Sequence, residues 1–237
     1  MSKEFDFRFE HALHYASLIK PRGPHHLSSL LNLEPIPRTC LDAPSLCDDF
    51  YINVLSWSSQ DIVAVGLDDS VYVDSLSARS VTRLFKEFGS YITSVKWAGK
   101  EVPNTLAVGN DSDLVTVWDT VSMEKTLSLQ GPEDSRFTGD IDWHGPQLAA
   151  GFGGGTVKLF DIRTPQTVLS INAHTRKVCG VKWNGHLLAT GADDNFSLCW
   201  DLRSMGHGGK VDKRGLHEPL WRWPQKGCVK VSRFPMS

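Results

Sequence analysis

The chain has 237 residues, of which 41% are hydrophobic and 22% are charged, and its formal net charge at pH 7 is −2. This composition is typical of a globular protein that can bury a sizeable core, which argues against a disordered or fibrous chain. The net charge is close to neutral and the chain has no basic arm, so the sequence predicts binding to neither nucleic acid nor an anionic membrane surface.

The five cysteines are an odd set without Cys-x-x-Cys spacing, so the sequence predicts neither a disulfide framework nor a zinc site. They favour a reducing, intracellular setting. The first residues include acidic side chains where a signal peptide would be apolar, and no stretch approaches the roughly 18 apolar residues of a spanning helix. We therefore expect a chain in the nucleus and cytoplasm that holds no metal or other cofactor.

Residues 1–37 lack strand periodicity and contain four prolines, so we expect a mostly irregular N-terminal segment there. From residue 38 to 237 the sequence repeats. Four short β-rich runs end on tryptophan, at Trp57, Trp97, Trp143 and Trp183. After each tryptophan a second apolar run closes on glycine, at Gly66, Gly109, Gly151 and Gly191. Such landmarks in a constant order are typical of a repeat protein.

The last three units also carry an aromatic residue followed by aspartate nine positions beyond that glycine, as Trp118-Asp119, Phe160-Asp161 and Trp200-Asp201. This is the WD dipeptide. Each unit adds a weaker outer strand, such as Lys125–Leu129 or Gln166–Ile171, to three alternating strands. Four strands of this kind make one propeller blade, and neighbouring blades share a core.

We therefore predict an all-β fold, a WD-repeat β-propeller of four blade units and the start of a fifth. The units lie near residues 50–86, 87–130, 131–173 and 174–224, with a partial unit at 225–237 in which Phe234 stands where a tryptophan would be. Because a WD ring usually closes with seven blades, the chain corresponds to a partial ring. Its open blade edges would expose unpaired strands, which predicts self-association or cover by a partner.

The fourth unit has the polar set that typically fixes a WD blade, consisting of His174, Thr190, Asp194 and Trp200. We expect His174 to bridge Asp194 and Thr190, with Thr190 reaching the Trp200 indole, so that these buried polar groups are paired. A catalytic His174–Asp194 dyad is the less favoured alternative. The first three units lack the histidine, and the first also lacks the WD tryptophan. No nucleophile-elbow or zinc-protease motif occurs, so binding is favoured over catalysis.

The run from Ile36 to Ser59, which contains Leu41-Asp42-Ala43-Pro44, Asp48-Asp49-Phe50-Tyr51 and Leu55-Ser56-Trp57-Ser58, resembles the Fizzy and Fizzy-related family. This family comprises the WD-repeat coactivators of the anaphase-promoting complex. The resemblance continues through Val178 to Trp183 and the Asp193-Asp194-Asn195 hairpin. It covers roughly Pro37 to Phe234.

The resemblance implies a subunit that selects degron-bearing cell-cycle proteins for a ubiquitin ligase and performs no chemistry itself. By resemblance, Asp42 would accept the arginine of a destruction box, a charge-assisted contact that suits a guanidinium. Asp49 would help to bind the lysine of a Lys-Glu-Asn degron. By the same resemblance Asp193 is the third expected degron-binding residue, although it stands where the family usually has asparagine. Pairing of these acidic side chains within their own loop is the alternative.

The chain also departs from the family pattern. The Asp-Arg-Tyr/Phe-Ile-Pro docking box is not found between Met1 and Pro37, and the chain ends in Met236-Ser237 where the family has Ile-Arg. Two alternatives therefore stay open. Arg163 and Arg203, in Asp-x-Arg motifs, are compatible with a substrate receptor of a cullin-4 type ligase, and an inactive truncated scaffold relative would compete for partners.

Overall fold

The computed structural model describes residues 43–44, 46–76, 78, 80–86, 89–133, 135, 137–164, 166–205 and 217–231. Backbone contacts divide the chain into two units, Met1–Ala43 and Pro44–Ser237, and every described strand lies in the second. Asp42, Phe234 and the whole of the predicted irregular segment at 1–37 lie outside the described residues.

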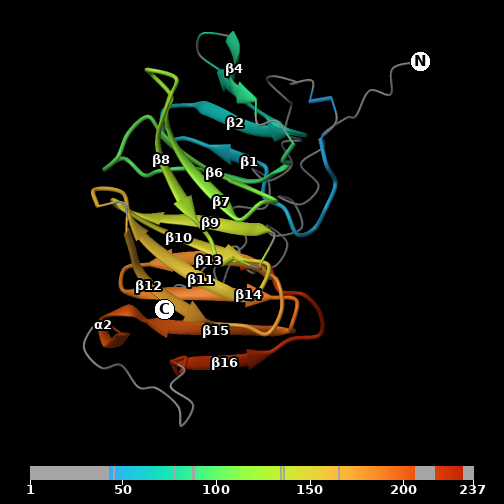
Figure 1. Cartoon of the computed structure of the whole chain (residues 1–237), viewed down its shortest axis with the longest axis vertical. Coiled ribbons are helices and arrows are strands. Elements are labelled where there is room, and N and C mark those ends of the chain that lie inside the picture. The colour runs from blue at the N-terminus through green and yellow to red at the C-terminus, as the bar shows by residue number, and fades with distance from the viewer. Residues whose placement is uncertain are drawn as a thin grey trace, which may run out of the picture. The chain divides into compact units, whose positions relative to one another are not determined.

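The described strands form four sheets of four strands, each an antiparallel meander in chain order (Figure 1). The first sheet contains β1 (Leu55–Trp57), β2 (Ile62–Leu67), β3 (Ser70–Ser75) and β4 (Ser80–Lys86). The second contains β5 (Ile92–Trp97), β6 (Thr105–Asn110), β7 (Leu114–Asp119) and β8 (Glu124–Gln130). The third contains β9 (Thr138–His144), β10 (Gln147–Phe152), β11 (Thr156–Asp161) and β12 (Gln166–Asn172). The fourth contains β13 (Val178–Asn184), β14 (Leu187–Ala192), β15 (Phe196–Asp201) and β16 (Trp221–Pro224), with the short helix α2 (Leu202–Met205) after β15. The predicted WD-repeat blades are confirmed.

The turns repeat as well as the strands. The first hairpin of each blade contains a residue with a positive backbone φ, at Asp61, Asn104, Gly145 and Gly185. The second hairpin does the same, at Asp68, Asp113, Gly155 and Asn195. Aspartate, asparagine and glycine tolerate this left-handed conformation best, so the sequence supplies a suitable residue at every turn.

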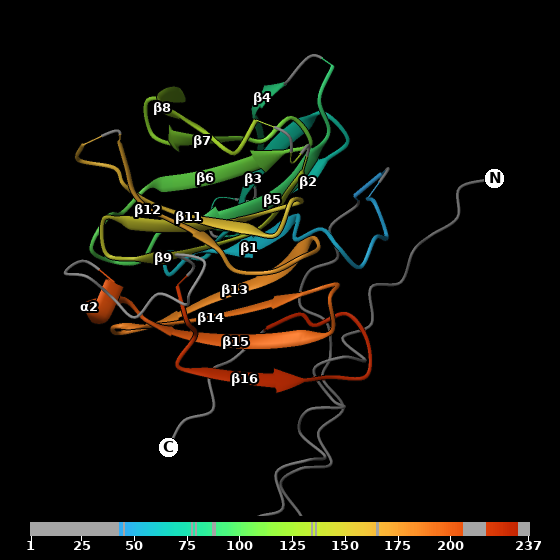
Figure 2. The same cartoon turned by 60° about the horizontal axis from the view of Figure 1, so that its bottom comes forward.

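Figure 2 shows β13 to β16 of the fourth blade lying side by side. The blades themselves pack face to face in chain order. The inner strands β1, β5, β9 and β13 contact one another in that order, and Asn53 pairs with Ser94 in a parallel bridge between the first two blades. Apolar side chains form one core cluster at each of the three blade interfaces. Burial between blades, and not within one sheet, therefore holds the fold together.

In the second, third and fourth blades the inner-strand tryptophan packs in the interface with the preceding blade. Trp97 is 6% exposed and Trp183 is 8% exposed, whereas Trp57 in β1 is 58% exposed. Its neighbour on the same strand, Leu55, is 59% exposed. No blade of the described chain precedes β1, so this apolar face is open to solvent.

The first blade differs in register from the others. In the fourth blade Leu188 of β14 pairs with Trp200, the WD tryptophan, whereas in the first blade the corresponding Val63 pairs with Asp74. The hairpin between β2 and β3 is one residue shorter than its counterparts. The tryptophan site of the first blade is thus occupied by Asp74, which is 8% exposed.

Residues 225–231 lie against the fourth blade as the start of a further unit. Gln225 N donates to Asn195 O at 2.7 Å and Val229 N donates to Ala192 O at 3.2 Å. A Cβ at Gly191 would lie 2.5 Å from Val229 O, just as one at Gly151 would lie 2.4 Å from Val178 Cγ1 of the next blade. The segment occupies the place at which the sequence predicts the partial fifth unit.

Candidate functional site

The segment that leads into the first blade, residues 46–54, forms a tight turn around Asp49. The Asp49 carboxylate accepts a hydrogen bond from Tyr51 N at 2.8 Å, and its carbonyl oxygen accepts one from Ile52 N at 3.3 Å. Aspartate commonly bonds to the backbone two residues ahead in this way. The Asp49 side chain is exposed. Its local pairing therefore coexists with access from solvent.

Tyr51 joins this leading segment to the fourth blade. Its hydroxyl donates to Asp193 Oδ1 at 3.2 Å, across 142 positions of sequence. The hydrogen bond to the Asp193 carboxylate and the negative charge of that carboxylate raise the pKa of Tyr51. The other oxygen of Asp193 lies 3.6 Å from Arg176 Nη1. Asp193 is thus held between a phenol and a guanidinium.

Lys177 lies between the aromatic rings of Tyr51 and Phe137. Its ammonium nitrogen is 4.6 Å from the centre of the Tyr51 ring and 3.9 Å from that of Phe137, within the range of cation–π attraction. Tyr51, Phe137 and Lys177 each stand six positions before the inner-strand tryptophan of their own blade. The repeat therefore brings one equivalent position from three blades to a common surface, which we call the Tyr51 face (Asp49, Tyr51, Phe137, Arg176, Lys177 and Asp193).

Lys230 ties the start of the further unit to the leading segment. Its ammonium group donates to Phe50 O at 3.1 Å and to Ile52 O at 3.0 Å. It also lies 5.5 Å from the centre of the Phe50 ring. The two ends of the described propeller segment thus meet beside the Tyr51 face.

Of the three degron-binding residues that the sequence predicts, two come together. Asp49 and Asp193 are linked through Tyr51, whose amide bonds to the first and whose hydroxyl bonds to the second. Asp42 lies outside the described residues. Tyr51, Phe137, Arg176 and Lys177 were not predicted from the sequence. The common distance of Tyr51, Phe137 and Lys177 from the repeat tryptophans is a signal that could have identified these three.

The blade-four network (His174, Thr190, Asp194 and Trp200) is assembled as a chain of hydrogen bonds. His174 Nδ1 lies 3.0 Å from Asp194 Oδ1, and its Nε2 lies 2.8 Å from Thr190 Oγ1. The Trp200 indole donates to the same Thr190 oxygen at 3.0 Å. One assignment satisfies all of them, with Nδ1 donating to the carboxylate and the Thr190 hydroxyl donating to Nε2.

This network has the properties of a structural element. Burial lowers the pKa of His174, since a charged imidazolium would lose solvation, although Asp194 opposes this shift. Thr190 is 0% exposed and His174 is 8% exposed. Both ring nitrogens of His174 are engaged and the Thr190 oxygen also accepts the indole N–H, so these groups pair with one another, which supports the structural interpretation over a catalytic dyad.

The chain is similar to WD-repeat proteins of known families. The WDR54 family model matches residues 55–220. "Anaphase-promoting complex subunit cdc20" of Dictyostelium discoideum is 34% identical over 173 residues, which are 71% of this chain and 34% of that protein. "Cell division cycle 20.5, cofactor of APC complex" of Arabidopsis thaliana is 36% identical over 170 residues, which are 70% of this chain and 37% of that protein. "Meiotic fizzy-related protein 1" of Schizosaccharomyces pombe is 36% identical over 173 residues, which are 71% of this chain and 40% of that protein.

The chain belongs to the WD-repeat proteins that the WDR54 model describes and to the Fizzy and Fizzy-related family. A chain in the crystal structure of the mitotic checkpoint complex shares the fold at a TM-score of 0.73 and 28% identity, over 89% of this chain and 61% of that one. This Fizzy-family chain spans only 34% to 40% of the length of the three curated relatives named.

The two Asp-x-Arg motifs of this Fizzy-family chain are closed on themselves. Arg163 Nε and Nη2 donate to the Asp161 carboxylate at 2.9 and 2.6 Å, and Arg203 makes the same pair of bonds to Asp201 at 3.1 and 2.8 Å. The hydrogen bonds from Arg163 lower the pKa of Asp161 to about 2. Each guanidinium thus donates two hydrogen bonds to the aspartate two positions before it, which disfavours these arginines as adaptor contacts.

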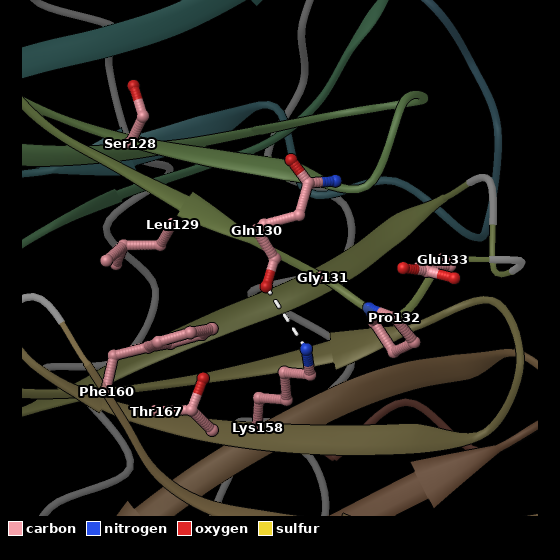
Figure 3. Close-up of a pocket in the computed structure, with 9 residues that line it drawn as sticks. All are labelled: Ser128, Leu129, Gln130, Gly131, Pro132, Glu133, Lys158, Phe160 and Thr167. Atoms are coloured by element: carbon pink, nitrogen blue, oxygen red, sulfur yellow. Dashed lines mark hydrogen bonds between the residues drawn. The ribbon is translucent and has the colours of Figure 1, made fainter.

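A pocket lies between the second and third blades of this Fizzy-family chain (Figure 3). Strands β8 and β11 and the start of β12 line it, and Phe160 and Thr167 lie on one side. Its only ammonium group, that of Lys158, donates to Gln130 O at 3.2 Å. The pocket lacks a convergent set of titratable groups, so it does not have the features of a catalytic cleft.

Among the described residues, no group of three or more histidine, cysteine, aspartate or glutamate side chains is placed to hold a metal ion. No helix in the described part of this Fizzy-family chain has the length and apolar character needed to cross a membrane.

Proposed function

We propose that this chain is a coactivator-like subunit of the anaphase-promoting complex that binds degron-bearing cell-cycle proteins through the Tyr51 face. Family membership supports the class of function, because two of the three relatives named are described as a subunit or a cofactor of that complex. The observation that carries the choice of surface is the bridge from Asp49 through Tyr51 to Asp193. It gathers negative charge on a face that the leading segment and the fourth blade build together.

The chemistry of the Tyr51 face suits a short peptide with both charges. The exposed Asp49 carboxylate complements a cationic side chain such as the lysine of a Lys-Glu-Asn degron. Arg176, which lies beside Asp193, and Lys177, which lies over the Tyr51 ring, complement an adjacent glutamate. Asp42 would provide the carboxylate for a destruction-box arginine in the same proposal.

The experiment measures binding of fluorescent Lys-Glu-Asn and destruction-box peptides to the full 237-residue chain. We expect Asp49→Ala to weaken the Lys-Glu-Asn peptide by about tenfold or more, the scale of one charge-assisted contact. Asp42→Ala should selectively weaken the destruction-box peptide. Asp193→Asn tests whether a carboxylate or an amide suits this position better.

Asp119→Ala is the matched control, because Asp119 Oδ1 also accepts a hydrogen bond at 2.8 Å from the backbone two residues ahead, at the end of β7 and away from the leading segment. Equal losses in Asp49→Ala and Asp119→Ala would contradict the assigned face. A well-folded wild-type chain that binds neither peptide nor purified anaphase-promoting complex would leave the inactive scaffold as the better interpretation.

Self-association through the open face of β1 belongs to the same proposal. Leu55 and Trp57 are exposed there, whereas their counterparts Val181 and Trp183 are buried beneath the preceding blade. A second copy could supply the missing apolar cover. Analytical ultracentrifugation should show a concentration-dependent dimer that Trp57→Asp abolishes, and a monomer at all concentrations would contradict it.

We also propose a nuclear and cytoplasmic location, which imaging of the tagged chain tests.

A further inference from the structure

Two cysteines that are distant in sequence have their sulfur atoms in contact. Cys179 Sγ in β13 lies 2.8 Å from Cys228 Sγ in the segment that begins the further unit, 49 positions away. Both are free thiols. A disulfide bond requires an S–S distance of about 2.05 Å, so the thiols need to approach by less than 1 Å to be linked.

We propose that Cys179 and Cys228 are an oxidation site, at which a small-molecule disulfide of the glutathione type converts the two thiols to an intrachain disulfide bond. The site does not depend on the proposed function. Their spacing in sequence gives no Cys-x-x-Cys signal, and only the fold brings them together.

The surrounding backbone is already seated for this bond. Val229 N donates to Ala192 O at 3.2 Å, which fixes the residue next to Cys228 against the end of β14. A Cβ at Gly180, the residue after Cys179, would lie 2.3 Å from Val231 N. The absence of a side chain at Gly180 allows the two segments to approach closely, so the disulfide requires little backbone movement.

Accessibility sets the order of the chemistry. Cys179 is 0% exposed, whereas Cys228 retains part of its surface. The Cys228 thiol loses its proton to solvent and its thiolate attacks one sulfur of glutathione disulfide, which breaks that bond and releases one glutathione thiolate. The Cys179 thiolate then attacks the Cys228 sulfur and displaces the second glutathione. Two protein thiols are oxidised, one glutathione disulfide is reduced, and the two protons end on the two released glutathiones.

The thiols are slow to ionise. Burial raises the pKa of Cys179 and that of Cys228. Since the thiolate is the attacking species, the rate of disulfide formation should rise with pH between about 7 and 9. Linking the two residues would hold Lys230, which donates to Phe50 O and Ile52 O, against the leading segment. Oxidation would therefore stiffen that segment.

The test treats the reduced full-length chain with glutathione disulfide at pH 8, blocks free thiols, and maps tryptic peptides without reduction. Trypsin should release Val178–Lys182 and Gly227–Lys230 as one linked species. Intact mass should show the loss of two hydrogen atoms at this pair. The melting temperature should rise by roughly 5 °C, as expected when a cross-link closes a long loop. Slower amide exchange at Ile52 and Asn53 in the oxidised chain would report the stiffened leading segment.

Cys179→Ser and Cys228→Ser should each remove the linked species, whereas Cys47→Ser, at an exposed cysteine, should leave it unchanged. A folded wild-type chain that accumulates only a glutathione adduct on Cys228 would overturn the proposal. So would linkage of either cysteine mainly to Cys47. Peptide mapping reports on the site whether or not degron peptides bind, so its failure is distinct from failure of the proposed function.

Discussion

The first and fourth blades have the same strand order but different interiors. In the fourth blade, Trp200 is 1% exposed and belongs to a chain of polar groups that ends at the Asp194 carboxylate. In the first blade, Asp74 takes the register position of that tryptophan, and Trp57 on the inner strand is open to solvent. The four-stranded blade therefore forms even where the WD tryptophan and its polar network are not present.

The difference shows what each part of the repeat contributes. Strand alternation and positive-φ turns are present in both blades, so these suffice to specify a four-stranded meander. The polar network adds a buried, fully paired connection between the incoming turn, the second strand and the third strand of one blade. We expect the fourth blade to depend on individual side chains more strongly than the first.

The largest effect should come from Trp200→Ala. Removing this buried indole leaves a cavity and takes away the hydrogen bond that the indole donates to Thr190 Oγ1, and should lower the free energy of unfolding by about 3–5 kcal/mol. Trp57→Ala removes the same side chain from an exposed site and should cost less than about 1 kcal/mol. Urea denaturation followed by circular dichroism measures both. Similar losses in the two variants would show that the blades depend equally on their tryptophans.

A second prediction concerns the joint between the third and fourth blades. The Asp140 carboxylate accepts a hydrogen bond from Val181 N at 2.8 Å, and burial raises its pKa from 3.8 to about 6, although that bond and Lys96 oppose the shift. Between pH 4 and 6 the folded chain binds more protons at this group than the unfolded chain does. Stability contributed by Asp140 should therefore fall as pH rises through this range, by at most about 3 kcal/mol.

Asp140→Asn should remove this component of the pH dependence, whereas Asp119→Asn, far from the joint, should keep the wild-type profile. Denaturation midpoints at pH 4, 5, 6 and 7 provide the comparison. An Asp140→Asn chain whose stability changes with pH as the wild type does would mean that the carboxyl is not protonated in the folded state at these pH values.

The blades could be predicted from the sequence because they depend on strand alternation. The blade-four network could be predicted because its members lie within about 30 residues of one another. Asp74 was not identified as the occupant of the tryptophan site, since a hairpin shortened by one residue changes the register without changing the strand pattern. The Tyr51–Asp193 bond and the Cys179–Cys228 contact join distant segments. The packing of the blades decides which loops meet. The local periodicity of the sequence does not specify these contacts between loops.

A smaller effect is expected for His174→Ala, at about 2 kcal/mol, because the variant leaves Asp194 and Thr190 without their shared partner. His186→Ala, at an exposed turn of the same blade, should be nearly neutral. The lowered pKa of His174 means that the unfolded chain takes up the proton first. Its contribution should be present above about pH 6.5 and decline as pH falls below that value, opposite in sign to that of Asp140. Thermal melts from pH 5 to 8 on an Asp140→Asn background separate the two.

The smallest expected effect is a difference in stability between variants of Trp97 and Trp183, which pack at the first and third blade interfaces. Trp183 Nε1 donates to Gly185 O at 2.9 Å, whereas Trp97 Nε1 is buried without a hydrogen-bond partner among the described residues. Phenylalanine removes similar volume at both positions, but at Trp183 it also removes a satisfied hydrogen bond. Trp183→Phe should therefore be more destabilising than Trp97→Phe by about 1 kcal/mol in urea denaturation. If Trp97→Phe proves the more costly, its indole nitrogen is paired in solution, and the interface beside the first blade is as well satisfied as the one beside the fourth.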